Sequence, residues 1–387
     1  MPIKVEDYYA PATFQRMKAF ADTQETPFVV IDTAIISQAY DDLRAGFEFA
    51  KVYYAVKANP AVEIIDLLKE KGSSFDIASI YELDKVMGRG VSPDRISYGN
   101  TIKKSKDIRY FYEKGVRLFA TDSEADLRNI AKAAPGAKVY VRILTEGSTT
   151  ADWPLSRKFG CQTDMAMDLL ILARDLGLVP YGLSFHVGSQ QRDISVWDAA
   201  IAKVKVIFER LKEEDGIHLK LINMGGGFPA NYITRTNSLE TYAEEIIRFL
   251  KEDFGDDLPE IILEPGRSLI ANAGILVSEV VLVARKSRTA VERWVYVDVG
   301  MFSGLIETMG EAIKFPLYTE KKGEMEEVVI AGPTCDSADI MYENYKYGLP
   351  LNLAIGDRLY WLSTGAYTTS YSAVEFNGFP PLKSFYL

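Results

Sequence analysis

The sequence predicts an α/β protein made of a (β/α)₈ barrel and a separate β-rich domain. Two observations lead to this fold class. Between residues 53 and 267, eight short apolar runs alternate with segments of helical periodicity. After about residue 273 that periodicity ends and β-rich runs follow. A chain of 387 residues is long enough for one large barrel and one smaller domain.

Each expected barrel strand is a short apolar or β-branched run that ends in a polar residue or a glycine. The runs are 53–57, 74–79, 96–99, 118–122, 139–143, 182–188, 221–227 and 260–267. The segments between them carry apolar residues at helical spacing, as in VEIIDLLKEKG after the first run. Eight alternations of this kind are typical of a closed barrel rather than an open sheet, and we place the barrel at residues 34–273.

The second domain is predicted from the sequence pattern of the C-terminal part of the chain. LVSEVVLVARKS, RWVYVDVG, EEVVIAGPT and DRLYWLSTGAYTT are β-rich, with turn residues between them. The strand-like PFVVID (27–32) precedes the barrel and can pair with these strands, because the two ends of a domain often lie close together. We therefore assign residues 1–33 and 274–387 to one β-rich domain.

Composition excludes several classes of protein. The 48% hydrophobic and 25% charged residues are those of a globular chain. A net charge of -10 gives no basic surface for nucleic acid or for an anionic membrane. Two cysteines cannot build a disulfide framework, and two histidines argue against a multi-histidine metal site. Without a signal-peptide pattern or an apolar run of about 18 residues, we expect a cytoplasmic location.

Functional residues of such barrels gather where the strands end. The ends of the expected strands carry Lys57, Asp76, Asp122, Arg142, His186, Gly225, Gly226, Gly227, Glu264 and Arg267. Lys57 ends an apolar run, where desolvation would lower the pKa of its amine and favour a nucleophile or a Schiff base. A strand-end lysine with a buried stem is the alternative.

Three further features could contribute to a ligand-binding site. The glycines 225–227 would let backbone N–H groups approach a phosphate, although a flexible turn has the same composition. Glu264 and Arg267 in EPGR offer an acceptor and a cation to one ligand, or form a structural ion pair. His186 offers a flat ring beside Ser189, and a core histidine is the alternative.

In the β-rich domain, GPTCDSAD (332–339) places Cys335 and Asp336 among small turn-forming residues. This composition favours an exposed functional loop, and a buried, inert cysteine is the alternative. GAYTT (365–369) and FNGFP (376–380) place aromatic residues beside glycines.

Seven motifs occur in one order along nearly the whole chain: YYAVKANP, FDIAS, HVGSQ, GGGFP, EPGR, CDSAD and GAYT. Together they resemble the alanine-racemase-like decarboxylases that depend on pyridoxal 5'-phosphate (PLP), the family of ornithine, diaminopimelate and arginine decarboxylases. The length and the C-terminal motif are most similar to the bacterial ornithine and lysine/ornithine enzymes. The resemblance implies that Lys57 holds PLP covalently, that His186 stacks on the pyridine ring, and that Glu264 keeps the ring nitrogen protonated.

The resemblance also assigns the rest of the site. The further cofactor contacts are Asp76, Arg142, Ser189, Gly226, Gly227, Arg267 and Tyr367. Cys335, as the acid that reprotonates the product, and Asp336, as the partner of the substrate's distal ammonium, match residues that one subunit of a head-to-tail homodimer inserts into the site of the other. Phe376 and Glu311 are placed beside the substrate, Glu311 where the family's ornithine enzymes carry an aspartate.

The activity implied is decarboxylation of L-ornithine to putrescine and CO₂ in polyamine biosynthesis, with L-lysine to cadaverine as a second reaction. Diaminopimelate decarboxylase and amino-acid racemase are alternatives on the same fold. A non-catalytic regulatory homologue is a third, which the presence of Lys57, His186, Glu264, Arg267 and Cys335 disfavours.

Overall fold

The computed structural model describes residues 3–145, 150–153 and 158–387. The chain divides into two compact units, which are described separately here. The barrel unit comprises Ser37–Pro229 and Asn237–Gly266. The β unit comprises Met1–Ile36, Ala230–Thr236 and Arg267–Leu387, so the short segment after GGGFP groups with the β-rich part of the chain.

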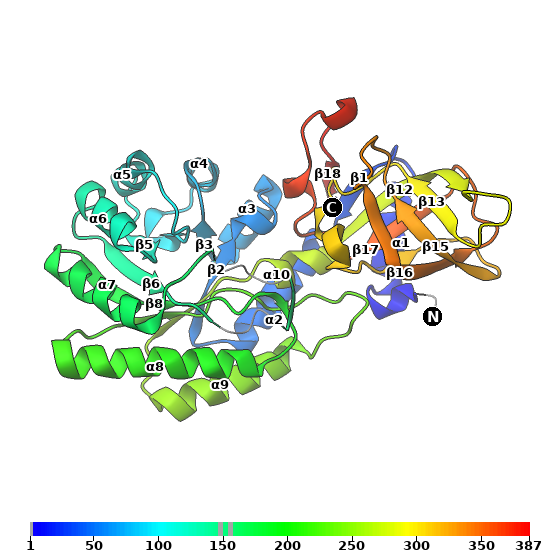
Figure 1. Cartoon of the computed structure of the whole chain (residues 1–387). Coiled ribbons are helices and arrows are strands. Elements are labelled where there is room, and N and C mark those ends of the chain that lie inside the picture. The colour runs from blue at the N-terminus through cyan, green and yellow to red at the C-terminus, as the bar shows by residue number, and fades with distance from the viewer. Residues whose placement is uncertain (1–2, 146–149, 154–157) are drawn as a thin grey trace. The chain divides into compact units, whose positions relative to one another are not determined.

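Among the described residues of the barrel unit, eight parallel strands close into a barrel in the order β10-β11-β2-β3-β4-β5-β6-β8 (Figure 1). Their bounds are β2 Ala50–Ala55, β3 Ser74–Ile77, β4 Ile96–Tyr98, β5 Leu118–Thr121, β6 Lys138–Arg142, β8 Val179–Ser184, β10 Leu221–Asn223 and β11 Glu260–Leu263. Each overlaps one of the apolar runs identified in the sequence, so the predicted (β/α)₈ barrel is confirmed. Parallel strands are covered on both faces, which explains why the runs are continuously apolar.

Helices surround the barrel strands (Figure 1). Their bounds are α2 Thr33–Gly46, α3 Val62–Glu70, α4 Ile80–Gly88, α5 Ser105–Glu113, α6 Glu124–Ala133, α7 Thr163–Asp175, α8 Ser195–Asp215 and α9 Leu239–Phe254. From α3 to α9, each helix contacts the next. Local signals set their ends: the Ser79 hydroxyl accepts the N–H of Glu82 at the start of α4, and Gly216 in the left-handed conformation ends α8. A two-stranded ribbon, β7 (Ala151–Trp153) with β9 (Ser189–Gln191), completes the unit.

The β unit contains one mixed sheet in the order β14-β17-β12-β13-β15-β16, in which β1 also pairs with β12 and β18 pairs with β1. Its strands are β1 Phe28–Ile31, β12 Gly274–Ala284, β13 Arg293–Val297, β14 Leu317–Tyr318, β15 Met325–Ala331, β16 Ile340–Pro350, β17 Arg358–Leu362 and β18 Lys383–Tyr386. Strand β1 pairs antiparallel with β12, Val30 opposite Ile275. The prediction that the N-terminal strand joins the β-rich domain is therefore confirmed.

Short helical segments connect this sheet: η1 Val5–Asp7, α1 Pro11–Ala21, α10 Arg267–Ile270, η5 Ala271–Ala273, η6 Ile306–Glu311, η7 Thr369–Tyr371 and η8 Phe376–Gly378. Helix α1 packs Phe14 and Met17 against the sheet residues Phe28, Val277 and Tyr360 in one apolar core. Within the described part of the chain, every helix is too short or too polar to span a lipid bilayer.

Candidate active site

Lys57 lies in a single 3-10 turn, η2 (Val56–Ala58), that directly follows β2. Its neighbours Val56 and Ala58 are buried, but Lys57 itself is exposed. The expectation that burial would desolvate this lysine is therefore not met. Its positive charge nevertheless acts on the pKa values of Asp76 and His186, so the three groups share one electrostatic environment.

Asp76 lies near the end of β3, where it pairs with Ala55 of β2. The buried Ser97 hydroxyl donates to Asp76 Oδ1 at 3.0 Å. Burial, together with the nearby carboxylate of Glu264, raises the pKa of Asp76 well above its usual value, while the Lys57 ammonium works in the opposite direction. Asp76 therefore favours its protonated form more than an exposed aspartate does.

Glu264, directly after β11, is held by a residue that sequence analysis missed. The Nδ2 of buried Asn223 donates to Glu264 Oε1 at 2.5 Å. The Oδ1 of the same amide accepts the backbone N–H of Gly225 at 2.9 Å. Asn223 thus ties the carboxylate to the glycine loop. Its signal in the sequence was its position as the strand residue just before MGGG.

Gly226 lies where the backbone of Glu264 and the ring of His186 approach each other. A β-carbon at Gly226 would lie 2.6 Å from the carbonyl oxygen of Glu264 and 3.4 Å from His186 Nε2. Contacts shorter than about 3 Å are not tolerated by a side chain, so this position requires glycine. The glycine loop therefore lies beside both the histidine and the acid.

His186 follows β8, and its Nδ1 accepts the backbone N–H of Gly188 at 3.1 Å. This hydrogen bond assigns the ring proton to Nε2 in the neutral imidazole. Burial, with the nearby charges of Arg142 and Lys57, holds the pKa of His186 well below its usual value. The ring is accordingly flat, neutral and fixed in one tautomer at neutral pH.

The two other expected contacts of the barrel unit lie on β6 and β9. Arg142, the last residue of β6, places its guanidinium 4.9 Å from the centre of the Phe159 ring. Burial lowers the pKa of Arg142, against the opposing charge of Glu264. Ser189 opens β9 and pairs with Trp153. Asp122, after β5, accepts the backbone N–H of Gly160 at 2.8 Å.

In the β unit, Arg267 is the first residue of α10 and is only 3% exposed. Its Nη1 and Nη2 donate to the two carboxylate oxygens of Glu307 at 2.6 and 2.5 Å, and Nη1 also donates to the Tyr232 hydroxyl at 2.9 Å. The Tyr367 ring centre lies 4.7 Å from the guanidinium. Burial opposes the charge of Arg267, but the Glu307 carboxylate outweighs it and raises the pKa. Sequence analysis missed Glu307.

The loop 332–339 presents Cys335 and Asp336, and both are exposed. The backbone N–H of Cys335 donates to Asn377 Oδ1 at 2.9 Å. Phe376, beside this contact, is 37% exposed and lies 4.8 Å from the Phe302 ring. The alternative of a buried Cys335 is wrong.

The other cysteine, Cys161, is the buried one. Burial raises the pKa of the Cys161 thiol to about 12.

Glu311 is the last residue of η6, and its carboxylate accepts hydrogen bonds from the backbone of β16. Within the β unit, the structure therefore brings together two groups of expected site residues. Arg267 lies with Tyr367, and the loop residue Cys335 contacts Asn377, which follows Phe376.

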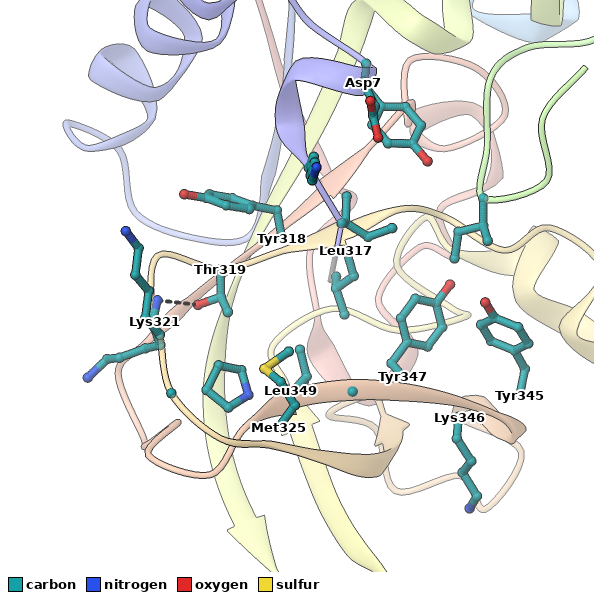
Figure 2. Close-up of a pocket in the computed structure, with 18 of the residues that line it drawn as sticks. Asp7, Leu317, Tyr318, Thr319, Lys321, Met325, Tyr345, Lys346, Tyr347 and Leu349 are labelled. Atoms are coloured by element: carbon teal, nitrogen blue, oxygen red, sulfur yellow. Dashed lines mark hydrogen bonds between the residues drawn. The ribbon is translucent and has the colours of Figure 1, made fainter. Parts of the chain in front are cut away.

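A cavity of about 810 Å³ also lies in the β unit, lined in part by Leu317, Met325, Tyr345, Tyr347 and Leu349 (Figure 2). None of the expected site residues lines it.

The family model for "Pyridoxal-dependent decarboxylase, pyridoxal binding domain" matches residues 33–271. The chain belongs to this family.

Individual relatives agree with this assignment. The chain is 33% identical over 366 residues to the lysine/ornithine decarboxylase of Selenomonas ruminantium, covering 94% of this chain and 90% of that protein. It is 31% identical over 374 residues to antizyme inhibitor 2 of Xenopus laevis, covering 90% and 79%. The solved structure of the lysine/ornithine decarboxylase of Vibrio vulnificus with cadaverine superposes with a TM-score of 0.87 at 28% identity, covering 98% of this chain and 99% of that one.

The barrel unit of this family member suits the cofactor for which the matched domain is named. Its residues supply an exposed amine at Lys57, a neutral flat ring at His186 and an anchored carboxylate at Glu264. PLP presents complementary groups, namely an aldehyde, an aromatic ring with a basic nitrogen, and a phosphate. The glycine loop offers backbone N–H groups for the phosphate without interfering side chains.

Proposed function

We propose that this chain is a PLP-dependent amino-acid decarboxylase that converts L-ornithine to putrescine and CO₂, with L-lysine as a second substrate. The observation that supports this most is the group at the barrel strand ends: Lys57, the neutral His186, and Glu264 held by Asn223. The names of the relatives in Selenomonas and Vibrio favour a diamino acid as substrate.

Each residue of the barrel unit has a separate task in this reaction. PLP, when bound, supplies an electron sink for the electron pair that remains when CO₂ leaves the substrate. Lys57 would hold the cofactor through its amine. Glu264 would keep a proton on the ring nitrogen, which the sink requires, and Asn223 keeps its carboxylate oriented. The neutral His186 would stack on the ring without adding a second positive charge.

We assign the remaining steps to residues of the β unit. The Cys335 thiol would donate a proton to the carbon that lost CO₂, and Asp336 would pair with the substrate's distal ammonium. We further propose a head-to-tail homodimer in which the exposed loop 332–339 of one subunit completes the site of the other. Exposure of Cys335 and Asp336 supports this arrangement, because a loop that serves another subunit must lie on the surface of its own.

A substrate panel tests the proposal. The purified protein with PLP would be assayed for CO₂ release from ornithine, lysine, arginine and diaminopimelate. We expect the highest kcat/KM for ornithine, with lysine next. A preference for diaminopimelate would contradict the assignment. Loss of optical activity without release of CO₂ would instead identify a racemase.

A non-catalytic role is the second candidate, because antizyme inhibitor 2 is among the relatives. The presence of Lys57, His186, Glu264 and Cys335 argues against it. Titration of the protein with PLP distinguishes the two functions: a decarboxylase should develop the visible absorbance of covalently held cofactor, and a chain that has lost the chemistry should not.

A further inference from the structure

Four acidic residues of the β unit lie on η6 and on the loop 332–339: Glu307, Glu311, Asp336 and Asp339. A cationic substrate side chain needs a carboxylate that is not already committed to groups inside the protein, because each oxygen accepts only a small number of hydrogen bonds. The internal contacts of the four carboxylates therefore decide which of them can bind such a substrate.

Glu311 is committed to strand β16. Its Oε1 accepts the backbone N–H groups of Glu343 and Asn344 at 2.8 and 2.6 Å, and its Oε2 accepts that of Tyr345 at 2.9 Å. Partial burial acts to raise the pKa of Glu311, but the three N–H groups outweigh it and hold the pKa below its usual value. Both oxygens of an ionised carboxylate are thus directed at the backbone.

These three N–H groups need an acceptor because the sheet does not supply one. Strands β15 and β16 pair Val328 with Tyr347, and the next pair is Ile330 with Tyr342. Between these two pairs the chain advances by two residues in β15 but by five residues in β16. Residues 343–346 therefore form a long bulge in β16. Backbone N–H groups in a bulge lose their ladder partners and must be satisfied in another way. The Glu311 carboxylate takes the place of the missing strand contacts.

The backbone of η6 is shaped to deliver this carboxylate. Gly310 and Glu311 both adopt the left-handed conformation, with φ of 61° and 56°. A residue other than glycine in this region costs roughly 1 kcal/mol or more and persists only where its surroundings hold it. Lys314 Nζ donates to the Glu311 carbonyl at 2.7 Å, and the Tyr342 hydroxyl donates to that of Ile313 at 2.7 Å. Contacts on both sides therefore keep Glu311 directed at the bulge.

Glu307 and Asp339 are committed as well. Glu307 holds the Arg267 guanidinium with both oxygens. Asp339 is buried, and its two oxygens accept the backbone N–H groups of Met301 at 2.8 Å and Thr334 at 3.1 Å. Asp336 differs, because it is exposed and its Oδ1 accepts one backbone N–H, that of Ala338 at 2.9 Å.

We propose that Glu311 is a positioning residue that fixes the β16 bulge, and with it the adjoining loop 332–339, rather than a residue that binds the distal ammonium of the substrate. This inference rests on the proposed function. Strand β16 begins directly after the loop, and the pairs of Ala331 with Ile340 and of Ile330 with Tyr342 connect the loop to the bulge. A displaced bulge would therefore be expected to shift Cys335 and Asp336 together. The side chains of Tyr345 and Tyr347 at the far end of the bulge point toward the cavity of Figure 2.

The test compares Glu311→Gln with Asp336→Asn in the holoenzyme, with Glu343→Gln as the matched control. Glu343 is an exposed acid of the same bulge whose backbone N–H, not its side chain, contacts Glu311. Hydrogen exchange of the segment 340–350 and kcat/KM for ornithine and lysine would be measured for all three variants.

Glu311→Gln should speed exchange of the amides of residues 343–345 by about tenfold or more, because a charge-assisted acceptor is lost. It should lower kcat/KM for both substrates alike and change their ratio by less than about threefold, below the roughly tenfold effect of a lost specificity contact. Asp336→Asn should lower kcat/KM about 30-fold or more through KM and leave exchange unchanged. Glu343→Gln should alter neither measurement.

The proposal is overturned if Glu311→Gln leaves exchange of 343–345 unchanged, or if it changes the ornithine to lysine ratio about tenfold or more as a substrate contact would. If Glu311→Gln does not fold, Glu311→Asp, whose shorter side chain cannot reach all three N–H groups, is measured in the same way. Exchange is read without substrate. A wild-type enzyme that turns over neither amino acid would therefore refute the proposed function, and with it the role of Asp336, while exchange still decides the role of Glu311 in the bulge.

Discussion

The barrel unit and the β unit hold their functional side chains in different ways. In the barrel unit, Asp76 and Glu264 lie at or just beyond the ends of parallel strands, so the fold itself collects them at one edge. In the β unit, Cys335 and Asp336 lie on a surface loop, while Glu307 and Glu311 lie in a 3-10 turn and serve internal contacts. Residues at the ends of neighbouring parallel strands lie close together because the strands end at the same edge of the barrel. The positions of residues in turns and loops depend instead on contacts with segments far away in the sequence.

The largest effect on activity is expected from a substitution in the barrel unit. Lys57→Ala should lower turnover on the order of 10⁴-fold and remove the visible absorbance of covalently held PLP, because it removes the amine that would hold the cofactor. The melting temperature without PLP should remain close to that of the wild type, since Lys57 is exposed. Steady-state kinetics, absorbance and thermal unfolding check these outcomes. A variant that keeps the absorbance would show that Lys57 is not the attachment point.

Glu307→Gln should produce the largest loss of stability in the β unit. It leaves the Arg267 guanidinium buried without its carboxylate partner, and breaking a buried pair in this way costs about 3–5 kcal/mol. Urea unfolding monitored by circular dichroism measures the free energy of unfolding. Glu320→Gln is the control, because Glu320 is 59% exposed and its pair with Lys18 should contribute less than about 1 kcal/mol. Equal effects of the two substitutions would mean that burial of the Arg267 pair is unimportant.

Asn223→Ala should have an intermediate effect and should act through Glu264. Without the amide, the carboxylate loses its donor and Gly225 loses its acceptor, so we expect kcat to fall about 10- to 100-fold. Absorbance of the bound cofactor should persist but change its dependence on pH, because Glu264 would no longer be held in place. Asn344→Ala, at an exposed asparagine of the β unit, is the control and should behave as wild type. If the pH dependence of the absorbance is unchanged in Asn223→Ala, Asn223 does not act through Glu264.

The smallest effect tests whether the two units act across a dimer. Lys57→Ala and Cys335→Ala are each expected to be nearly inactive, the second with its cofactor absorbance intact. After subunit exchange, hybrids with one complete site form, and about a quarter of wild-type activity should return. Ornithine decarboxylation by the mixture measures this recovery. If the mixture is no more active than its components, the proposed shared site is wrong. Either Lys57 and Cys335 of one site then come from the same subunit, or one of the two residues takes no part in the reaction.

Sequence analysis predicted the barrel unit well because its signals are local. An apolar run of strand length marks each strand, and the residue that ends the run lies at the edge of the barrel. His186 and Glu264 could be selected in this way. The addition of β1 to the second sheet could also be predicted, because a strand-like segment outside the barrel has few other partners.

The missed contacts join segments far apart in the chain. Asn223 and Glu264 are 41 residues apart, Arg267 and Glu307 are 40 apart, and Glu311 lies more than 30 residues before the bulge that it holds. No spacing rule connects such positions, because their proximity depends on strand register and on the path of each connection. Lys57 was expected to be buried but is exposed. The 3-10 turn after β2 could not be inferred from the apolar run.

For this protein, the sequence alone determined the strand and helix periods, the family motifs and the residues at the strand ends, because these depend on the order of neighbouring residues. Only the tertiary structure decided which acids are committed to internal partners. A carboxylate looks the same in any sequence, and its role depends on whether a guanidinium, a bulged strand or solvent lies opposite it. That distinction separates Glu307 and Glu311 from Asp336.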